Sequence, residues 1–307
     1  MTSPDPRDTA PPAVPDGVLK GRRALVTGAS RGIGAAVAER LAAEGAAVAV
    51  VARTAERHDH LPGSLRETAA RLEAHGARVV TVRADLADVA DRQRIIPEAT
   101  EGLGGPVDVL VNNAAAAIYA PLLSYPLRRR HIGFEVNVHA PLDLAQQVLP
   151  AMVAAGQGWI VNVSSATARP APGPPFSTSP PGSTMGVYGA SKAALNRLTS
   201  ALAQELWGTG VRVNTVEPRT GVLTEGAEEL VGGVVDTSGW ESMEEMVEAV
   251  LALCHCPAEM TGGIEVSTDL VSRLGLTVRG LDGRWQGVNA TNSHGRGDRQ
   301  KEAISDE

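Results

Sequence analysis

Tyr188 and Lys192 are the two residues whose types and spacing most directly suggest acid/base chemistry. On a helix, side chains four residues apart lie on the same face. An isolated phenol titrates near ~10, so proton transfer near pH 7 needs a pKa lowered by about three units, or ~4 kcal/mol of preferential stabilisation of the phenolate. A neighbouring ammonium has the right charge to supply it. Taken alone, this spacing is common on solvated helix faces, and the pair by itself favours that interpretation.

A glycine-rich segment, TGASRGIG at residues 27–34, reverses that interpretation. It follows an apolar run at residues 23–27 and precedes an Ala/Leu-rich segment that reaches Glu44, so the order is strand, turn and helix. Glycines let a backbone turn tightly and approach a pyrophosphate, whose charge the N–H groups of a helix N-terminus bind. A merely flexible turn would not require this placement. The turn predicts a dinucleotide site, and a cationic nicotinamide ring would add to the charge of Lys192.

The elements that must position these residues alternate along the chain. Apolar runs predict seven strands, at residues 23–27, 46–52, 79–82, 107–111, 159–163, 211–216 and 263–267. Helices are predicted up to Glu44 and at residues 64–75, 88–101, 127–150, 188–207 and 243–253, with Ser64 and Glu67 as a capping-box pair, Pro97 interrupting the third helix and Pro141 inside the fourth. This alternation predicts an α/β fold, a doubly wound, Rossmann-like parallel sheet in a single domain, with ligands at the carboxyl ends of the strands.

The composition of the chain ends differs from that of the middle. Residues 1–20 are predicted to be a flexible N-terminal extension, residues 21–282 the folded domain, and residues 283–307 a polar C-terminal tail. Within the domain, residues 166–187 are rich in Pro, Gly and Ser and show no period of helix or strand. We expect this segment to be an inserted loop beside the active site.

The overall composition argues against several classes of protein. The formal net charge of −7 and an aromatic content of 3% leave neither a basic face nor stacking groups for nucleic acid. No apolar run approaches the ~18 residues of a membrane span, and the first residues lack the layout of a signal peptide. Cys254 and Cys256 flank His255 without a fourth ligand, so neither a metal site nor a disulfide framework is predicted. We therefore expect a cytoplasmic enzyme in a reducing compartment.

Several motifs occur in a fixed order along the chain: residues 27–34, Asp85-Leu86, Asn112-Asn113-Ala114-Ala115, Asn137, Asn162-Val163-Ser164-Ser165 and residues 188–192. With them the chain resembles the short-chain dehydrogenase/reductase family, of the Tyr-x-x-x-Lys type, over about residues 21–267. The resemblance implies a catalytic tetrad of Asn137, Ser165, Tyr188 and Lys192. In that tetrad Tyr188 exchanges the proton, Ser165 positions the substrate oxygen, Lys192 binds ribose and lowers the tyrosine pKa, and Asn137 holds a water at a helix irregularity.

The choice of cofactor depends on the end of the second strand, Val50-Val51-Ala52-Arg53-Thr54. A carboxylate there would bind the ribose 2′-hydroxyl of NAD, but no acid is present, and Arg31 and Arg53 could bind a 2′-phosphate through their fork geometry. NADP(H) is predicted; two solvated arginines are the alternative. The family pattern implies cofactor contacts from Gly28, Ser30, Arg31, Gly32, Ile33, Gly34, Arg53, Asp85, Leu86, Asn112, Asn113, Ala114, Tyr188, Lys192, Pro218, Val222 and Thr224.

Three departures from the family pattern stand out. Ala115 replaces a glycine, and Arg219 replaces the glycine of a Pro-Gly pair in the loop that normally reaches the nicotinamide, with Thr224 displaced by one residue. A solvent-facing Arg219 is preferred over one that contacts an acidic substrate group. Finally, Ser165 and Tyr188 are 23 residues apart where the family norm is nearer a dozen.

Together these features predict an NADP(H)-dependent oxidoreductase that interconverts a ketone or aldehyde with an alcohol. The substrate is a small molecule, and the resemblance implies a homodimer or homotetramer. Two alternatives remain open. One is a reductase of a keto-acyl intermediate held by an acidic carrier protein, contacted by the basic run at residues 128–130, which is more typical of a solvated face. The other is a cofactor-binding scaffold or sensor without turnover, which only the Arg219 anomaly favours.

Overall fold

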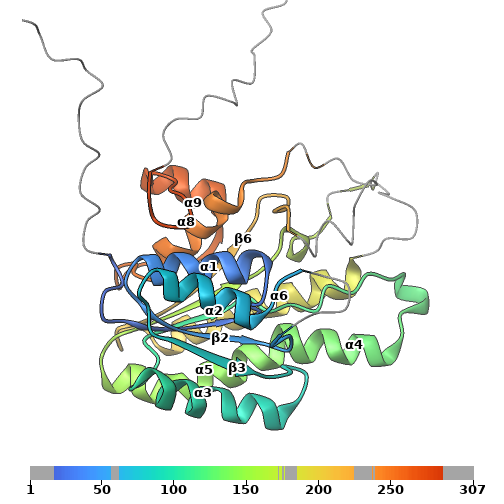
Figure 1. The fold of residues 1–307 in the computed structure, drawn as a ribbon. Coiled ribbons are helices and arrows are strands. Elements are labelled where there is room, and N and C mark those ends of the chain that lie inside the picture. Colours follow the sequence, from blue (N-terminus) through green and yellow to red (C-terminus); the bar gives the residue numbers. More distant parts are fainter. Residues whose placement is uncertain are drawn as a thin grey trace, which may run out of the picture.

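Seven parallel strands form the centre of the molecule (Figure 1). The structure is a computed structural model, and it describes residues 17–56, 62–171, 173–174, 176, 185–224, 237 and 239–285. The strands are β1 (Arg23–Thr27), β2 (Ala47–Ala52), β3 (Val79–Arg83), β4 (Val109–Asn112), β5 (Gly158–Val163), β6 (Val211–Glu217) and β7 (Ile264–Val266). Their order across the sheet is β3-β2-β1-β4-β5-β6-β7. The predicted doubly wound α/β fold is therefore confirmed, and strand order reverses between β1 and β4.

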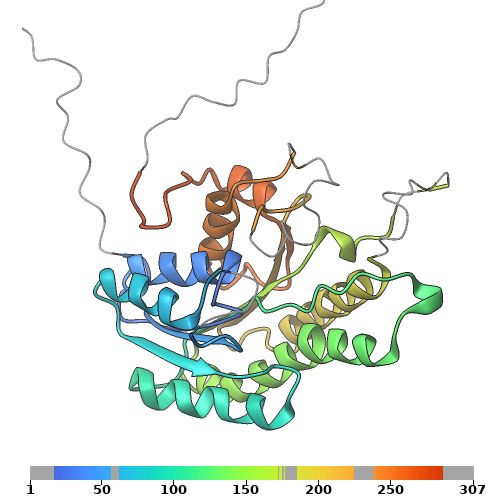
Figure 2. The ribbon, with the colours of Figure 1, turned by 45° about the vertical axis from the view of Figure 1, so that its right-hand side comes forward.

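Helices cover both faces of the sheet (Figures 1 and 2). One face carries α1 (Gly32–Ala43), α2 (Leu65–Ala74), α8 (Met243–Leu253) and α9 (Ser267–Leu274). The other carries α3 (Val89–Leu103), α4 (Leu127–Phe134), α5 (Ala140–Ala154) and α6 (Gly186–Glu205). Successive strand residues point to opposite faces, so Val48 and Val50 join the first core while Ala49 and Val51 join the second. This explains why the strands are continuously apolar.

Two predicted helix boundaries were wrong at proline. Pro97 lies inside a continuous α3, because Ile95, Ile96 and Ala99 are buried on either side of it and hold the helix against the sheet. The helix predicted to stop near Pro150 continues to Ala154, where Met152 is buried. Burial of an apolar face thus outweighs the loss of one backbone hydrogen bond at an exposed proline.

Other elements differ from the sequence prediction in smaller ways. The Ser64 hydroxyl accepts the Glu67 N–H at 3.1 Å, which is one half of the predicted capping box. A complete capping box, which was not predicted, starts α8 at Ser242 and Glu245. The α6 helix begins at Gly186, two residues before Tyr188, and α9 follows β7 directly where no helix was expected.

The chain ends are only partly within the described residues, as is the predicted inserted loop. Leu19, assigned from the sequence to the N-terminal extension, is buried in the first core, and its N–H donates to the Glu44 carbonyl at 3.0 Å. Of the predicted loop, Ala166–Ala168 form one 3-10 turn. Among the described residues, no helix has the length and apolarity needed to cross a membrane.

Candidate active site

Ser165, Tyr188 and Lys192 come together where β5 ends beside the first turns of α6. Ser165 follows β5 by two residues, and its side chain is hydrogen-bonded to Tyr188. The Lys192 ammonium lies 6.0 Å from the centroid of the Tyr188 ring and donates to the Val163 carbonyl at 2.7 Å. The helix thus presents Tyr188 and Lys192 on one face, as their spacing predicts, and the end of β5 supplies the serine.

Asn137 lies in a five-residue π turn, Glu135–His139, that joins α4 to α5. The side chain is completely buried and donates to the Ser191 hydroxyl at 2.9 Å and to the Ala116 carbonyl at 3.2 Å. Its Oδ1 accepts the Ala116 N–H at 2.8 Å. Single π turns inside α-helices are frequent at functional sites. Here the turn aims Asn137 so that it ties the segment after β4 to α6, next to Tyr188.

Burial dominates the electrostatics of this cluster. It raises the pKa of Tyr188 above the ordinary value of a phenol; the neighbouring Tyr119 adds to the rise, and the hydrogen bond with Ser165 opposes it. Burial also lowers the pKa of Lys192 to about 8. The lowering of the tyrosine pKa expected from Lys192 is therefore not found, because desolvation of the phenol has the largest effect on it.

The glycine-rich turn after β1 is packed against the end of β4. A Cβ added to Gly28 would lie 2.8 Å from the Ala114 Cα, and one added to Gly34 would lie 2.3 Å from the Asn113 Nδ2. The Thr27 hydroxyl accepts the N–H groups of both Asn113 and Ala114 at 3.1 Å. Gly28 and Gly32 have positive φ angles, which glycine adopts without strain. The turn is thus fixed by contacts that no larger residue would permit.

The N-terminus of α1 is suited to an anion. Arg31 is the N-cap residue and gives no side-chain cap, and the first turn contains no acidic residue. Helix N–H groups without a capping side chain, together with the helix dipole, attract a negatively charged group. Gly32, Ile33 and Gly34 form this first turn, and Ser30, which is buried, precedes it. The residues therefore fit the pyrophosphate of a dinucleotide.

The two arginines predicted near a 2′-phosphate differ in their contacts. Arg53 follows the end of β2 directly and is exposed. Arg31 donates from Nε to the Pro62 carbonyl at 2.9 Å and from Nη2 to the Gly63 carbonyl at 3.2 Å. The Ala29 N–H donates to the Val51 carbonyl at 3.2 Å, so the glycine-rich turn lies against the end of β2. Both arginines consequently stand at the same edge of the sheet.

Other predicted cofactor residues lie at this edge or beneath it. Asp85 is half-buried and accepts the Ala87 N–H at 3.0 Å, and Leu86 is buried. Asn112 lies inside the protein, where it donates to the Asn162 Oδ1 at 2.9 Å between β4 and β5. Three further residues follow β6: Val222 is buried, and Pro218 and Thr224 are half-buried. The interior position of Asn112 gives it a bracing contact between two strands.

Sequence reasoning overlooked Tyr119 and the pair Arg169 and Glu217. The Tyr119 ring stands edge-on to Tyr188, with centroids 5.8 Å apart and planes inclined by 66°. The Arg169 Nε lies 3.1 Å from the Glu217 Oε1, and its Nη2 donates to the Arg219 carbonyl at 3.0 Å. Two features of the sequence could have revealed them. Tyr119 is one of only three tyrosines, and Glu217 is an acid at the end of a strand whose other residues are nearly all buried.

Arg219, the residue that breaks the Pro-Gly pattern, points toward α9. It donates to the Thr268 hydroxyl at 3.0 Å and forms an ion pair with Asp269, and it is about half exposed. This arrangement leaves the side chain at the surface, with its charge paired to Asp269. Of the two positions considered from the sequence, at the surface or against an acidic substrate group, the structure has the surface position.

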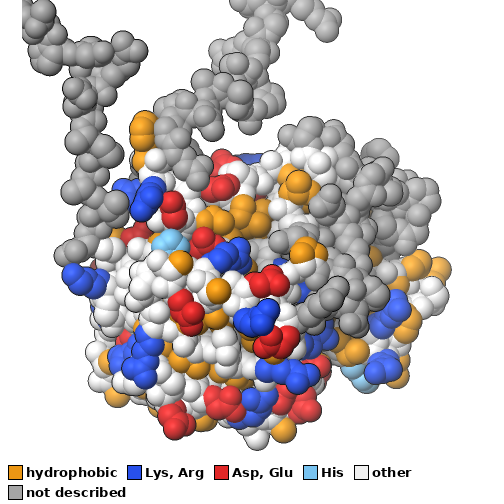
Figure 3. All heavy atoms as spheres, in the orientation of Figure 1, with side chains coloured by type: hydrophobic (Ala, Val, Ile, Leu, Met, Phe, Trp, Pro, Cys, Tyr) orange, Lys and Arg blue, Asp and Glu red, His pale blue; other side chains and the backbone are white. Residues whose placement is uncertain are grey.

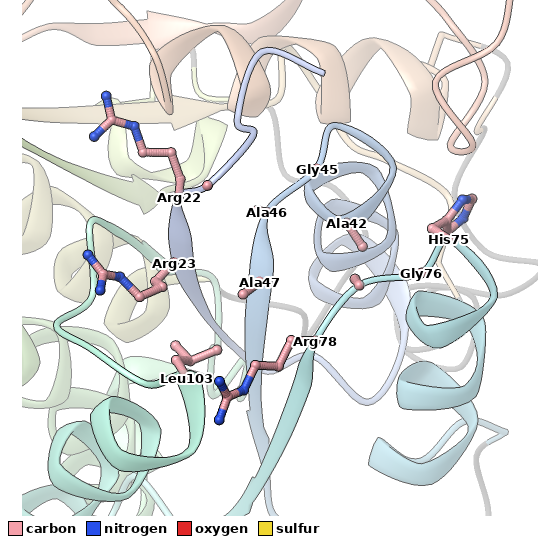
Figure 4. Close-up of a pocket in the computed structure, with 12 residues that line it drawn as sticks. Arg22, Arg23, Ala42, Gly45, Ala46, Ala47, His75, Gly76, Arg78 and Leu103 are labelled. Carbon is pink, nitrogen blue, oxygen red and sulfur yellow. The ribbon is translucent and has the colours of Figure 1, made fainter. Parts of the chain in front are cut away.

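A cavity of about 410 Å³ lies at the opposite, amino edge of the sheet (Figure 4). Arg22, Arg23, Arg78 and His75 are among its lining residues, and their charged groups point away from one another. The Arg22 guanidinium stacks 4.9 Å from the centroid of a Trp159 ring, and Arg23 is paired with an aspartate. These side chains do not converge on a ligand. Within the described ranges, no cluster of three or more His, Cys, Asp or Glu could hold a metal ion.

Comparison with known proteins assigns the family. The short chain dehydrogenase family model matches residues 22–233. L-xylulose reductase of Mesocricetus auratus is 34% identical over 260 residues, which cover 82% of this chain and 96% of that protein. Hydroxysteroid dehydrogenase-like protein 2 of Danio rerio is 29% identical over 85% of this chain, which spans only 60% of the length of that relative.

A solved structure agrees with this assignment. The 3-oxoacyl (acyl-carrier-protein) reductase of Agrobacterium tumefaciens, with NADP bound, has a TM-score of 0.66 and 32% identity, and the match covers 81% of this chain and 93% of that one. The chain belongs to the short chain dehydrogenase family.

Proposed function

We propose that this protein is an NADP(H)-dependent oxidoreductase that interconverts a ketone or aldehyde with the corresponding alcohol. The observation that carries the proposal is the cluster of Ser165, Tyr188 and Lys192 at the same sheet edge as the glycine-rich turn. One group of residues suits proton transfer to an oxygen, and the other suits a dinucleotide phosphate. A fold alone would not support an activity; the pairing of these two sites does.

Each side chain has a distinct part in the proposed reaction. When bound, the nicotinamide supplies the hydride that adds to the carbonyl carbon in reduction and accepts it back in oxidation. Ser165 donates a hydrogen bond to the carbonyl oxygen, and Tyr188 gives its phenolic proton to that oxygen, so carbonyl, hydride and proton together make the alcohol. Because burial raises the pKa of Tyr188, the phenol is protonated at neutral pH and ready to donate in the direction of reduction.

Lys192 and Asn137 support this proton transfer in the proposal. Lys192 is held by the Val163 carbonyl beneath the tyrosine ring, where its ammonium can reach a ribose hydroxyl and stabilise the phenolate left after proton donation. The pKa of Lys192, about 8, keeps most of the group charged at neutral pH. Asn137 fixes the segment after β4 against α6 and holds a water that returns the proton to Tyr188.

NADP(H) is proposed over NAD(H) because of the charges at the end of β2. Neither of the two residues that directly follow the strand, Arg53 and Thr54, is acidic, and Arg53 is exposed there with Arg31 on the neighbouring turn. A 2′-phosphate would gain charge-assisted hydrogen bonds at this position. The Agrobacterium reductase, which holds NADP, supports the same choice.

The location and assembly of the protein are further proposals. We infer a cytoplasmic homodimer or homotetramer acting on a small-molecule carbonyl compound, with no nucleic-acid or membrane partner; the acidic net charge and the family membership support this. The carrier-protein alternative is supported by the exposure of Arg128, Arg129 and Arg130 on α4. The scaffold alternative loses its one supporting observation, because Arg219 is turned toward Asp269.

Parallel titrations with NADPH and NADH, followed by the fluorescence of the reduced nicotinamide, test the proposal. NADPH should bind at least about tenfold more tightly than NADH, and Arg53→Ala should remove most of that difference by weakening NADPH alone. Arg78→Ala, which removes an exposed arginine at the opposite edge of the sheet, is the matched control. Failure of both nucleotides to bind would overturn the enzyme assignment; equal binding of both would overturn the choice of NADP(H).

A further inference from the structure

The aromatic side chain of Tyr119 stands directly against the proposed acid, Tyr188. It lies in the segment between β4 and α4, and hydrogen bonds fix the chain on its N-terminal side. Asn137 binds both backbone groups of Ala116, and the Tyr125 hydroxyl donates to the Ile118 carbonyl at 3.0 Å. The ring is half-buried. Tyr119 is therefore held in place before any ligand arrives, as a specificity group needs to be.

Large exposed apolar side chains lie on the three loops that follow β4, β5 and β6. Leu122 and Leu123 follow β4, Phe176 and Met185 follow β5, and Leu223 follows β6; we call these five residues the apolar rim. Leu123 is fully exposed, Leu122, Phe176 and Leu223 are more than half exposed, and Met185 is 37% exposed. Figure 3 shows hydrophobic side chains at the surface beside the loop that leads into α4. All three loops leave the carboxyl edge of the sheet, where the proposed reaction takes place.

One member of the apolar rim packs beside the reacting tyrosine. A Cβ added to Gly186 would lie 3.0 Å from a methyl carbon of Leu122, so that side chain packs on the first turn of α6, two residues before Tyr188. Tyr119, which stands against the Tyr188 ring, precedes Leu122 by three residues on the same segment. Isolated exposed apolar residues need no explanation, but several of them on loops that leave one edge of the sheet mark a surface for an apolar ligand or partner.

We propose that Tyr119 is a specificity-determining residue and that the substrate is a carbonyl compound whose carbonyl carbon bears a bulky apolar group, aromatic in the best case. This inference rests on the proposed function. The Tyr119 ring forms a wall at a steep angle to Tyr188, so a flat apolar group attached to the reacting carbon can lie along that wall while its oxygen meets the phenol. The remainder of a larger substrate then contacts the apolar rim.

Rates of NADPH-dependent reduction of acetophenone, cyclohexyl methyl ketone and butanone test the inference. The wild-type protein should prefer acetophenone over butanone by about 100-fold or more in kcat/KM, with the cyclohexyl ketone in between. Tyr119→Ala should lose at least tenfold of that preference, mainly through the KM of acetophenone, whereas Tyr119→Phe should retain it. Trp207→Phe is the control, because it changes an exposed aromatic ring just after the far end of α6, away from Tyr188.

Three results would overturn the inference while leaving the proposed function intact. The first is a wild-type protein that reduces ketones without preference for the apolar ones. The second is an equal fall of kcat for all three ketones in Tyr119→Leu, which would make Tyr119 a support of the Tyr188 ring. A change of sedimentation coefficient in Leu123→Ser, with selectivity unchanged, would assign the apolar rim to a second copy of the chain and would also overturn it.

A binding measurement separates this inference from a failure of the proposed function. Acetophenone should quench the fluorescence of NADPH bound to Tyr188→Phe and should fail to do so in the double variant that also carries Tyr119→Ala. Binding without any turnover in the wild-type protein would support the role of Tyr119 and overturn the oxidoreductase assignment. Turnover by the wild-type protein, together with unchanged acetophenone binding in the double variant, would support the oxidoreductase assignment and overturn the role of Tyr119.

Discussion

The two halves of the carboxyl edge of the sheet are built differently. On the side of β1, β2 and β3, the glycine-rich turn is short and is locked by backbone hydrogen bonds to Thr27 and by contacts that leave no room for a Cβ at Gly34. On the side of β5 and β6, the connections are long and carry exposed apolar residues, and two charged groups, Lys192 in α6 and Glu217 at the end of β6, are buried. The half at β1, β2 and β3 therefore offers a ligand mainly backbone groups, and the half at β5 and β6 offers it mainly side chains.

This difference follows from what each half has to recognise. A dinucleotide phosphate is the same in every member of a family, and fixed backbone N–H groups suffice to bind it. A substrate varies from protein to protein, so its recognition lies in side chains on loops that can change without disturbing the sheet. From this difference we expect substitutions of ligand-facing groups in the first half to alter cofactor binding and those in the second half to alter turnover and selectivity, whereas buried contacts in either half contribute to stability.

The sharpest test of the comparison is Tyr188→Phe. Loss of the phenolic proton should lower kcat/KM by about 10³-fold or more, because general acid catalysis contributes about 10²–10⁴. The affinity for NADPH should stay within about twofold, as the ring and its neighbours remain. Steady-state rates and a fluorescence titration measure the two quantities, with Trp207→Phe at the far end of α6 as the control. Residual activity above a tenth of the wild-type value would remove Tyr188 from the proton transfer.

Gly34→Ala tests the first half. The added methyl would meet the Asn113 Nδ2 at 2.3 Å and the Gly28 carbonyl oxygen at 2.4 Å, and neither the turn nor the end of β4 can move freely. We expect the free energy of unfolding to fall by about 3 kcal/mol and NADPH binding to weaken. Gly133→Ala in α4 is the control: its methyl meets nothing within 4 Å outside its own helix, so stability should be unchanged or rise by about 0.5–1 kcal/mol. Equal stability of both variants would contradict the locked turn.

The pH dependence of stability, compared between the wild-type protein and Glu241→Gln, tests the half of the edge at β5 and β6. It is buried beside Val222 and accepts a hydrogen bond from Ser267, and burial raises its pKa to about 7 from an ordinary 4.5. The folded protein therefore holds this proton more tightly than the unfolded chain, so the stabilisation is complete below about pH 4.5 and is lost as pH rises through 7. Relative to Glu241→Gln, the wild-type protein should lose about 2–3 kcal/mol between those limits, measured by urea unfolding at a series of pH values. A constant difference between the two proteins would show that Glu241 titrates normally.

Arg169→Ala is expected to have the smallest effect of the four. It leaves the buried Glu217 carboxylate without its arginine and frees the start of the long loop from the Arg219 carbonyl. Because Arg169 is half exposed, we expect a loss of about 1–2 kcal/mol in the free energy of unfolding together with a raised KM. The double variant with Glu217→Gln should recover part of the stability, since no buried charge then lacks a partner. Additive losses in the double variant would show that the pair is not coupled.

The sequence was sufficient for features that depend on local patterns. Apolar runs located the seven strands, and the order of motifs placed Tyr188, Lys192 and Ser165 at one edge, because parallel strands end there together. The same reasoning misjudged Pro97, whose neighbours are held by burial against the sheet rather than by their own helix propensity. It also could not place Asn112, since only the pairing of β4 with β5 shows that its amide faces Asn162.

The residues that the sequence did not reveal are those whose role depends on contacts between distant segments. Tyr119 and Tyr188 lie on different elements, and the arginine at position 169 meets its glutamate only because β5 and β6 are neighbours. Neither contact leaves a periodic signal, because each involves single residues on loops. The apolar rim likewise becomes visible only when three loops are seen to leave the same edge.

The strand order also determines when each strand pairing can form while the chain is being synthesised. The central strand β1 pairs with β2 on one side and with β4 on the other, and the contact between Arg23 and Asp108 that closes the second pairing spans 85 residues of chain. A ribosome that adds 5–20 residues per second needs roughly 4–17 s to make that stretch. Throughout this interval the nascent chain has an apolar strand with one unsatisfied edge, which is the kind of surface that chaperones bind and that neighbouring chains can pair with. The strands β1, β2 and β3 must therefore wait for β4 before the central strand β1 is protected on both edges.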